Sequence, residues 1–387
     1  MRRRNEPWLA NAVRLAAGAT LACCLGGAAQ AQKAYITHSG SLGGPGNSMS
    51  VLDTATDRIV GEPITVGIRP AGVAFTPDGK RAYVVNQGDD NVAVIDTRTD
   101  TVLNPPIAVG DQPWAVAVAP DGKRVYVTNL RSVSVIDPLT NLVVGDPIPV
   151  GDSPFGIAVS PDSKRVYVAS YDDGTVSVIN AETRTVLDTL AVGPGAWGVA
   201  LTPDGKKLYV TDRGTDGGSG SVIDTATGAV TKPLIATSTT TEGVAVTPDG
   251  RKAYFTNSVQ DTVSVLDTGT DAVLATLAVG DAPHGVAFTP DGRKAYVVNY
   301  VGLTVSVIDT ASDTVAADTI ALGFSSLVAG LFIQPKLFAG TPGTRNCAGQ
   351  SLSAEARRYG GTSAAARALG YGTVAKMQTA IRLYCAR

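Results

Sequence analysis

Short hydrophobic segments alternate with polar turns along most of this chain, and the same arrangement recurs at a nearly constant spacing. Each copy contains a Gly-Val-Ala segment, a Pro-Asp-Gly turn, a second apolar segment that includes Tyr, and a third that ends in Ile-Asp-Thr. Successive turn prolines are 41 to 45 residues apart, at Pro77, Pro120, Pro161, Pro203, Pro248 and Pro290, and a degenerate copy follows at Pro335. Alternating β segments at this period are typical of a β-propeller, in which each repeat forms one four-stranded blade.

The repeat over residues 72–110 shows the strand order that we expect in each blade. Residues 72–76 form the innermost strand, and Pro77-Asp78-Gly79 turns the chain, because Pro presets φ and Gly accepts a left-handed backbone. The second and third strands follow at 82–86 and 91–95, and the outer strand covers 102–109. The pattern therefore predicts four antiparallel strands, ordered from the centre outward.

The two ends of the repeat region complete one blade between them. The first segments, at 35–37, 51–53 and 59–66, correspond to the second, third and outer strands of a blade that lacks its inner strand. Residues 329–334 correspond to an inner strand with no blade after it. Pairing them would close the ring and leave no sheet edge free. We therefore predict an all-β fold, a seven-bladed β-propeller over residues 32–335 that a C-terminal inner strand closes.

The second strand carries a motif that is diagnostic at this period. It reads Tyr126-Val127-Thr128-Asn129 in one copy, and its Asn is replaced in others by His38, Ser170 and Asp212. With its Pro-Asp-Gly and Val-Ile-Asp partners, the repeat resembles the YVTN family of β-propellers, which are WD-repeat-like in architecture. The resemblance implies a seven-bladed fold and an exported or surface setting, and it carries over no catalytic residue.

Residues 1–31 read as a signal peptide that is removed on export. A basic start, Arg2-Arg3-Arg4, precedes an apolar stretch over 15–28 and a small-x-small cleavage site at Ala29-Gln30-Ala31. We expect a soluble periplasmic or secreted protein. A lipoprotein anchored through Cys23 or Cys24 is the alternative, although the residues before these cysteines fit that pattern poorly.

Residues 336–387 differ from the repeat region in charge and in pattern. They carry eight Lys and Arg against one Glu, whereas residues 32–335 carry 20 Lys and Arg against 32 Asp and Glu. Three short helices are predicted, at 351–359, 362–369 and 373–384. Cys347 and Cys385 are the only cysteines outside the signal peptide, and in an exported protein they predict a disulfide. This α-helical tail either caps the propeller or binds an envelope component.

Candidate binding residues lie just before each inner strand, where the loops differ between repeats. This position should surround the mouth of the central channel, and reading round the ring it holds Ala71, Trp114, Phe155, Trp197, Glu242, His284 and Ala329. Trp114, Phe155 and Trp197 would form an aromatic arc, with Arg69, Glu242 and His284 as polar groups. Such a mixed surface suits a small ligand or a loop of a partner. The alternative is that the aromatic rings only cap the joints between blades.

These observations lead us to expect a monomeric, non-catalytic binding or scaffolding protein without a cofactor. Its partner would be a small ligand or an envelope protein, and the acidic repeat region disfavours nucleic acid. The alternative function is a metal-assisted hydrolase or lyase that uses His38, His284 and Glu242. No neighbouring ligands at metal-binding spacing support these three residues. A structural role at the cell surface is a third possibility.

Overall fold

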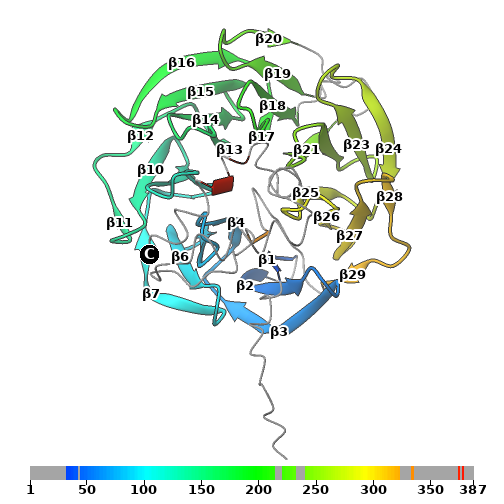
Figure 1. The fold of residues 1–387 in the computed structure, drawn as a ribbon. Coiled ribbons are helices and arrows are strands. Elements are labelled where there is room, and N and C mark those ends of the chain that lie inside the picture. The colour runs from blue at the N-terminus through cyan, green and yellow to red at the C-terminus, as the bar shows by residue number, and fades with distance from the viewer. Residues whose placement is uncertain are drawn as a thin grey trace, which may run out of the picture. The chain divides into compact units, whose positions relative to one another are not determined.

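The computed structural model describes residues 32–41, 44–213, 220–231, 240–322, 333–334, 374, 377 and 378. The chain divides into two compact units, residues 1–30 and 31–387, and every described residue belongs to the second. In this unit seven antiparallel sheets follow one another around a central axis, and in blades two to seven the first strand in sequence is the innermost (Figure 1). The predicted seven-bladed propeller is confirmed.

We number the blades one to seven in chain order. Blade one contains β1 (Lys33–Ser41), β2 (Gly44–Asp53) and β3 (Arg58–Thr65). Blade two contains β4 (Pro70–Phe75), β5 (Arg81–Asn86), β6 (Asn91–Asp96) and β7 (Thr101–Ala108). Blade three contains β8 (Val116–Val118), β9 (Val125–Asn129), β10 (Ser132–Asp137), β11 (Leu142–Val143) and β12 (Ile148–Pro149). Blade four contains β13 (Pro154–Val159), β14 (Arg165–Ser170), β15 (Thr175–Asn180) and β16 (Thr185–Ala191).

The remaining blades follow the same order. Blade five contains β17 (Ala196–Leu201), β18 (Lys207–Asp212), β19 (Ser221–Asp224) and β20 (Val230–Thr231). Blade six contains β21 (Thr241–Val246), β22 (Lys252–Asn257), β23 (Thr262–Asp267) and β24 (Val273–Ala278). Blade seven contains β25 (Pro283–Phe288), β26 (Lys294–Asn299), β27 (Thr304–Asp309), β28 (Thr314–Val315) and β29 (Ile320–Ala321). In blades three and seven the outer strand is split in two, and both pieces pair with the third strand.

The ring closes where the sequence predicts it. Ala34 of β1 pairs with Leu52 on one side and forms an antiparallel bridge with Ile333 on the other. The amide of Gln334 donates to the carbonyl of Lys33 at 2.8 Å. A segment from the C-terminal part of the chain thus supplies the inner position of blade one. The rest of the predicted closing strand, 329–332, lies outside the described residues.

The hydrophobic core lies between neighbouring blades rather than within one. Tyr83 and Val94 of blade two share a buried cluster with Val116 and Val127 of blade three. The second strand of each blade is almost fully buried because both of its faces meet an adjacent sheet. The outer strands are largely exposed, so they show little hydrophobic pattern.

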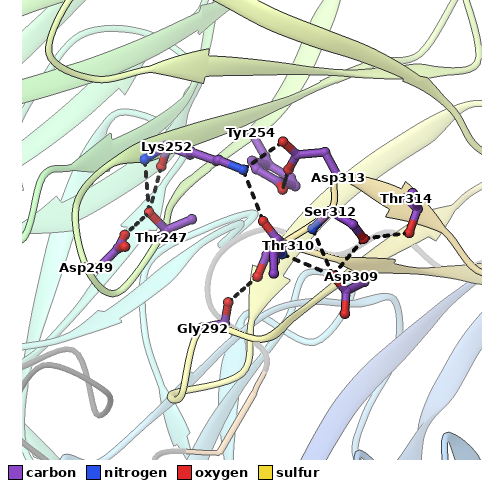
Figure 2. A network of polar contacts seen from close by, with 11 residues as sticks. Thr247, Asp249, Lys252, Tyr254, Gly292, Asp309, Thr310, Ser312, Asp313 and Thr314 are labelled. Atoms are coloured by element: carbon purple, nitrogen blue, oxygen red, sulfur yellow. Dashed lines mark hydrogen bonds and ion pairs between the residues drawn. The ribbon is translucent and has the colours of Figure 1, made fainter. Parts of the chain in front are cut away.

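A charged contact fastens four of the blade junctions. Lys252 of blade six lies with Nζ 2.7 Å from Oδ2 of Asp313 in blade seven, and Tyr254 donates to the other oxygen at 2.5 Å (Figure 2). Equivalent contacts between Lys, Tyr and Asp are Lys33–Tyr35–Asp100, Lys207–Tyr209–Asp271 and Lys294–Tyr296–Asp57. These junctions run consecutively from blade five, through blade one, to blade two.

The other three junctions have weaker polar contacts at the same place. Between blades two and three, Arg81 donates to the carbonyl of Pro138, and Tyr83 donates to Asn141 at 3.2 Å. Between blades three and four, Arg184 donates to the carbonyl of Val144. Between blades four and five, Arg165 donates to the carbonyl of Thr225. The polar contacts are therefore uneven around the ring, and the three junctions between blades two and five lack the Lys–Asp contact.

The predicted signal peptide, the disulfide between Cys347 and Cys385, and most of the predicted helical tail lie outside the described residues. Val374, Met377 and Gln378 are helical, and Met377 is buried. The helical module over residues 336–387 therefore stays a prediction. A search of the described residues finds no helix with the length and apolar character needed to cross a membrane.

Candidate functional site

In blades two and four to seven, the candidate residue lies in the first part of the inner strand, at a β-bulge. In blade six Thr241 pairs with Asn257, the register then shifts across Glu242, and pairing resumes at Val244. The same irregularity surrounds Trp197 in blade five and His284 in blade seven. A bulge adds an unpaired residue and redirects its side chain. These positions can therefore point toward the mouth instead of following the sheet.

Threonine side chains of the repeat motif hold neighbouring bulges together. Thr256 accepts a hydrogen bond from the amide of Gly243 at 2.7 Å and donates to the carbonyl of His284 at 2.6 Å. Thr211 makes the same pair of bonds to Gly198 and to the carbonyl of Glu242, both at 2.7 Å. The backbone under Glu242 and His284 is thus fixed from the adjacent blade.

Gly243 permits this close approach. A Cβ atom at that position would lie 2.2 Å from the carbonyl oxygen of His284, which is closer than nonbonded atoms can pack. The glycine that follows Glu242 therefore lets two inner strands meet, and it brings Glu242 beside His284.

The three predicted aromatic residues form one packed cluster. The rings of Phe155 and Trp197 stack with centroids 4.1 Å apart, and Trp114 meets Phe155 edge-on at 4.7 Å. Tyr171 adds a fourth ring, 5.8 Å from Phe155 and 5.9 Å from Trp197. These rings span blades three, four and five. They pack across blade junctions that lack the Lys–Asp contacts, as the joint-capping interpretation expects. They also lie at the mouth, as the binding interpretation expects.

The carboxylate of Glu242 is buried and held from one side. Its side chain is 2% exposed, and Oε1 accepts from Arg213 Nε at 2.8 Å and from Ser258 Oγ at 3.1 Å. Oε2 has no hydrogen-bond partner among the described residues. Burial raises the pKa of Glu242, while Arg213 and Ser258 oppose that rise. One oxygen is therefore fixed, and the other is free to interact with a bound molecule or water.

His284 lies next to this carboxylate, and its imidazole is neutral. Its Nε2 is 3.8 Å from Oε1 of Glu242, and its ring is 5.1 Å from that of Tyr300. Burial, assisted by the positive charge of Arg213, lowers the pKa of His284 to about 4. The imidazole is thus uncharged near neutral pH, when it can both donate and accept a hydrogen bond.

Arg213 connects the acidic and the aromatic parts of the site. Its guanidinium carbon lies 4.4 Å from the ring centroid of Trp197, a cation–π contact, while Nε holds Glu242. The contact with Glu242 is made through Nε, and the side chain is 37% exposed. It can therefore offer two N–H groups to a bound anion or carbonyl oxygen.

Two cavities meet at these residues. The first, which we call the mouth pocket, has a volume of about 680 Å³ and includes Trp114, Trp197, Arg213 and Glu242 in its lining. The second, which we call the channel pocket, has a volume of about 490 Å³ and runs along the inner strands of blades two to seven. Trp114, Phe155, Trp197 and Glu242 line both, whereas His284 lines the channel pocket. The charged groups thus lie at the boundary between the two cavities.

Two of the sequence candidates stand apart from this group. Arg69 is exposed, adopts a positive φ of 54°, and does not contribute to either pocket. His38 is buried in blade one, where Nδ1 lies 3.3 Å from Oγ of Ser48, and burial lowers its pKa to about 4. Within the described parts of the chain, no three His, Cys, Asp or Glu side chains are grouped so that they could hold a metal ion. Ala329 lies outside those parts.

Sequence reasoning missed Arg213, Ser258 and Tyr171. All three directly follow the second strand of their blade, and Gln87 and Leu130, which also line the mouth pocket, occupy the same place. In blades two to six, the position after the motif Asn is therefore a second residue of the repeat that lines the mouth pocket. Comparing that position between repeats would have revealed an Arg, a Ser and a Tyr on the blades that carry Trp197, Glu242 and Phe155.

Comparison with known proteins identifies a related family over part of the chain. Residues 105–277 match the family model described as "Lactonase, 7-bladed beta-propeller". That segment contains Trp114, Phe155, Trp197, Arg213 and Glu242, and His284 lies just beyond its end. A search of curated proteins finds no match.

Solved structures share the fold. Hydrazine synthase of Kuenenia stuttgartiensis is 26% identical, with a TM-score of 0.62 over 70% of this chain and 91% of that one. A putative 6-phosphogluconolactonase from Bacteroides fragilis NCTC 9343 is 16% identical, with a TM-score of 0.62 over 78% of this chain and 98% of that one. At this identity the second likeness shows the fold alone.

The expectation of a non-catalytic scaffold is wrong in the light of the match to the lactonase family model, which favours the hydrolase alternative. The expectation failed because the repeat motif describes the scaffold only. The polar groups that meet at the mouth come from three blades, and no local sequence pattern joins them.

Proposed function

We propose that this protein is a hydrolase that opens a cyclic ester at the mouth of the propeller channel. The observation that carries the proposal is the buried carboxylate of Glu242, which has one oxygen held by Arg213 and Ser258 and the other unpartnered among the described residues. It lies at the wall of a pocket built largely from the segment that matches the lactonase model. A buried polar atom without a partner needs an explanation, and a catalytic role is one of them.

Glu242 would act as the general base. A carboxylate whose pKa is raised by burial is a stronger base than one in water, and it can take a proton from a water molecule through Oε2. Ser258 and Arg213 restrict the rotation of the carboxylate, because both hold Oε1. The base is thereby oriented before the substrate arrives.

Arg213 would stabilise the negative charge that develops on the carbonyl oxygen. It contacts Glu242 through Nε, and its position over Trp197 keeps the guanidinium at the mouth pocket, where its Nη atoms would receive that charge. Neutral His284 lies on the neighbouring blade seven, with Nε2 3.8 Å from Oε1 of Glu242, and it can hydrogen-bond the attacking water or the ring oxygen.

The reaction balances with these groups alone. The oxygen of water bonds to the lactone carbonyl carbon while its proton passes to Glu242, and the carbonyl oxygen becomes an oxyanion beside Arg213. The oxyanion then collapses, the bond between the carbonyl carbon and the ring oxygen breaks, and Glu242 returns the proton to that oxygen. The product is the open-chain hydroxy acid.

The test is hydrolysis of simple γ- and δ-lactones by the purified protein. The reaction is monitored by titrating the released acid at constant pH. We expect turnover above the rate in solution and a loss of about 10²- to 10⁴-fold in Glu242→Gln, since general-base catalysis contributes that much. Glu182→Gln, an exposed acid on a turn of blade four, is the control and should keep full activity. Absence of lactone hydrolysis, or unchanged activity in Glu242→Gln, would refute the proposal. Dialysis against a chelator separates this route from the metal-assisted one, because activity that survives needs no bound metal.

We also propose that the protein works outside the cytoplasm as a YVTN-type propeller. The basic start, the apolar stretch and the Ala29-Gln30-Ala31 site support export, and the Tyr-Val-Thr-Asn repeats support the family. Cell fractionation followed by N-terminal sequencing of the mature chain tests the first part, since export predicts a new N-terminus at Gln32.

A further inference from the structure

The channel pocket beneath Glu242 has an unusually uniform lining. From the bulge residues it follows the inner strands down to Pro120, Pro161 and Pro203 in the turns at the opposite face. Among the described residues, the rest of its lining consists of Ala, Gly, Val, Ile, Leu and Phe residues and the aromatic arc. Within the described residues, Thr202, Glu242 and His284 supply the only hydroxyl, carboxyl and imidazole groups of that lining. Two of these three stand at the upper end, where the proposed reaction occurs.

This separation of polar and apolar groups constrains what can bind. Val199, Leu201, Val244 and Val246 line the channel and remain partly accessible, so the structure leaves apolar surface uncovered inside a cavity of about 490 Å³. Apolar surface gains free energy when an apolar group replaces water there. A charged or heavily hydroxylated group would lose its hydration without finding partners along this lining.

We infer that the substrate is a lactone with a linear alkyl substituent, whose ring lies at Glu242 and whose chain extends into the channel pocket. The inference rests on the proposed function, because it names the substrate class of the same site. The ring carbonyl and ring oxygen meet Arg213, Glu242 and His284 at the boundary of the two cavities. The alkyl chain meets the valine and leucine side chains of blades five and six below them.

The chain-length dependence of hydrolysis tests this inference. With γ-butyrolactone and γ-lactones that carry ethyl, butyl and hexyl groups, kcat/KM should rise about fourfold per CH₂, the equivalent of about 0.8 kcal/mol. Leu201→Gln and the nearly isosteric Val246→Thr place polar atoms in the channel and should flatten that slope. Leu274→Gln, on the exposed outer strand of blade six, should leave the slope unchanged. A slope of zero in the natural protein, or one that neither channel variant alters, would overturn the inference.

A binding measurement distinguishes failure of this inference from failure of the proposed function. Linear 1-alkanols of increasing length have no lactone to hydrolyse, and their binding can be followed by the fluorescence of Trp114 and Trp197, which line the channel. Affinity that rises with chain length and falls in Leu201→Gln supports the channel site even if no lactone is turned over. Hydrolysis of short lactones together with alkanol binding that ignores chain length would keep the function and reject the alkyl chain.

Discussion

Arg213 of blade five donates from Nε to Oε1 of Glu242 in blade six at 2.8 Å, across the junction between the two sheets. The pair joins a residue at the end of a second strand to one on the bulge of the next inner strand. Because Glu242 is buried, its charge depends on this one neighbouring cation and on the hydroxyl of Ser258. Both the chemistry and the local stability of the mouth therefore depend on the contact.

Removing Arg213 should weaken the protein as well as the reaction. Arg213→Gln leaves the buried carboxylate without its cation, so we expect the free energy of unfolding to fall by about 1–3 kcal/mol. The loss stays at the lower end of what a fully buried pair would show, because Arg213 is 37% exposed. Urea unfolding measures it, with Arg251→Gln, from an exposed ion pair, as the control. Equal stability of the two variants would contradict the role given to this contact.

The pH dependence of activity should report the pKa of Glu242. Burial raises that pKa above the ordinary 4.5, and the base works only when it is ionised, so kcat/KM should fall on acidification at a pH above 4.5. Arg213 lowers this pKa, hence in Arg213→Gln the fall should begin at a higher pH still. A pH–rate profile of both proteins tests this, and identical acid limbs would argue against Glu242 as the base.

Stability should decline as the pH falls from about 6.5 to about 4. His38 and His284 have folded pKa values of about 4, below the usual 6.5, so in this range the unfolded chain binds protons that the folded one does not. Each histidine contributes up to about 3 kcal/mol above pH 6.5 that is lost toward pH 4. His38→Asn, which restores the residue of the repeat motif, should halve this dependence in thermal unfolding. An unchanged pH profile in that variant would show that His38 is protonated in the folded state.

The contact between Lys252, Tyr254 and Asp313 should stabilise the junction of blades six and seven. Asp313→Asn removes the ion pair and weakens the bond from the tyrosine hydroxyl, and we expect a loss of about 1–3 kcal/mol (Figure 2). Lys206→Gln breaks a pair whose side chains are 82% and 56% exposed, and it should cost less than about 0.5 kcal/mol. Chemical unfolding compares them, and similar losses would mean that the junction contact has no special weight.

Gly243→Ala should damage the site without touching a catalytic group. The added methyl group would meet the carbonyl of His284 at 2.2 Å, so the two inner strands must separate. We expect a loss of about 2 kcal/mol in stability, since overpacking costs 1–3 kcal/mol, and a large loss of activity. Gly269→Ala, on an exposed turn of blade six where the nearest neighbour is 3.2 Å away, is the matched control. Full activity in Gly243→Ala would show that the spacing of Glu242 and His284 is not critical.

The fold could be predicted almost completely because its determinants are local and repeated. The prolines from Pro77 to Pro290 mark a turn in each copy, and the alternation around residues such as Tyr83 and Tyr254 marks a strand. Even the closure of blade one followed from counting strands, and the bridge between Ala34 and Ile333 bears it out. The aromatic arc could also be predicted, because the same position of three consecutive repeats holds Trp114, Phe155 and Trp197.

The site was predicted only in part, for a physical reason. Glu242 and His284 were singled out from their place in the repeat, but their partner Arg213 was not, since it belongs to a different position on the neighbouring blade. Arg69 was chosen for its nearness in sequence to the mouth, yet it is exposed and away from both pockets. Side-chain contacts between blades depend on how far each bulge redirects its residue, which the repeat alone does not specify.

By itself the sequence determined the number of blades, the strand order within each blade and the aromatic arc at the mouth. These features follow from short-range backbone preferences that act identically in every copy. Only the tertiary structure decided that Arg213, Glu242 and His284 meet, that the channel below them is apolar, and that four junctions carry Lys–Asp contacts. Those relationships join residues tens of positions apart, and they exist only once the closed ring has brought neighbouring blades within hydrogen-bonding distance.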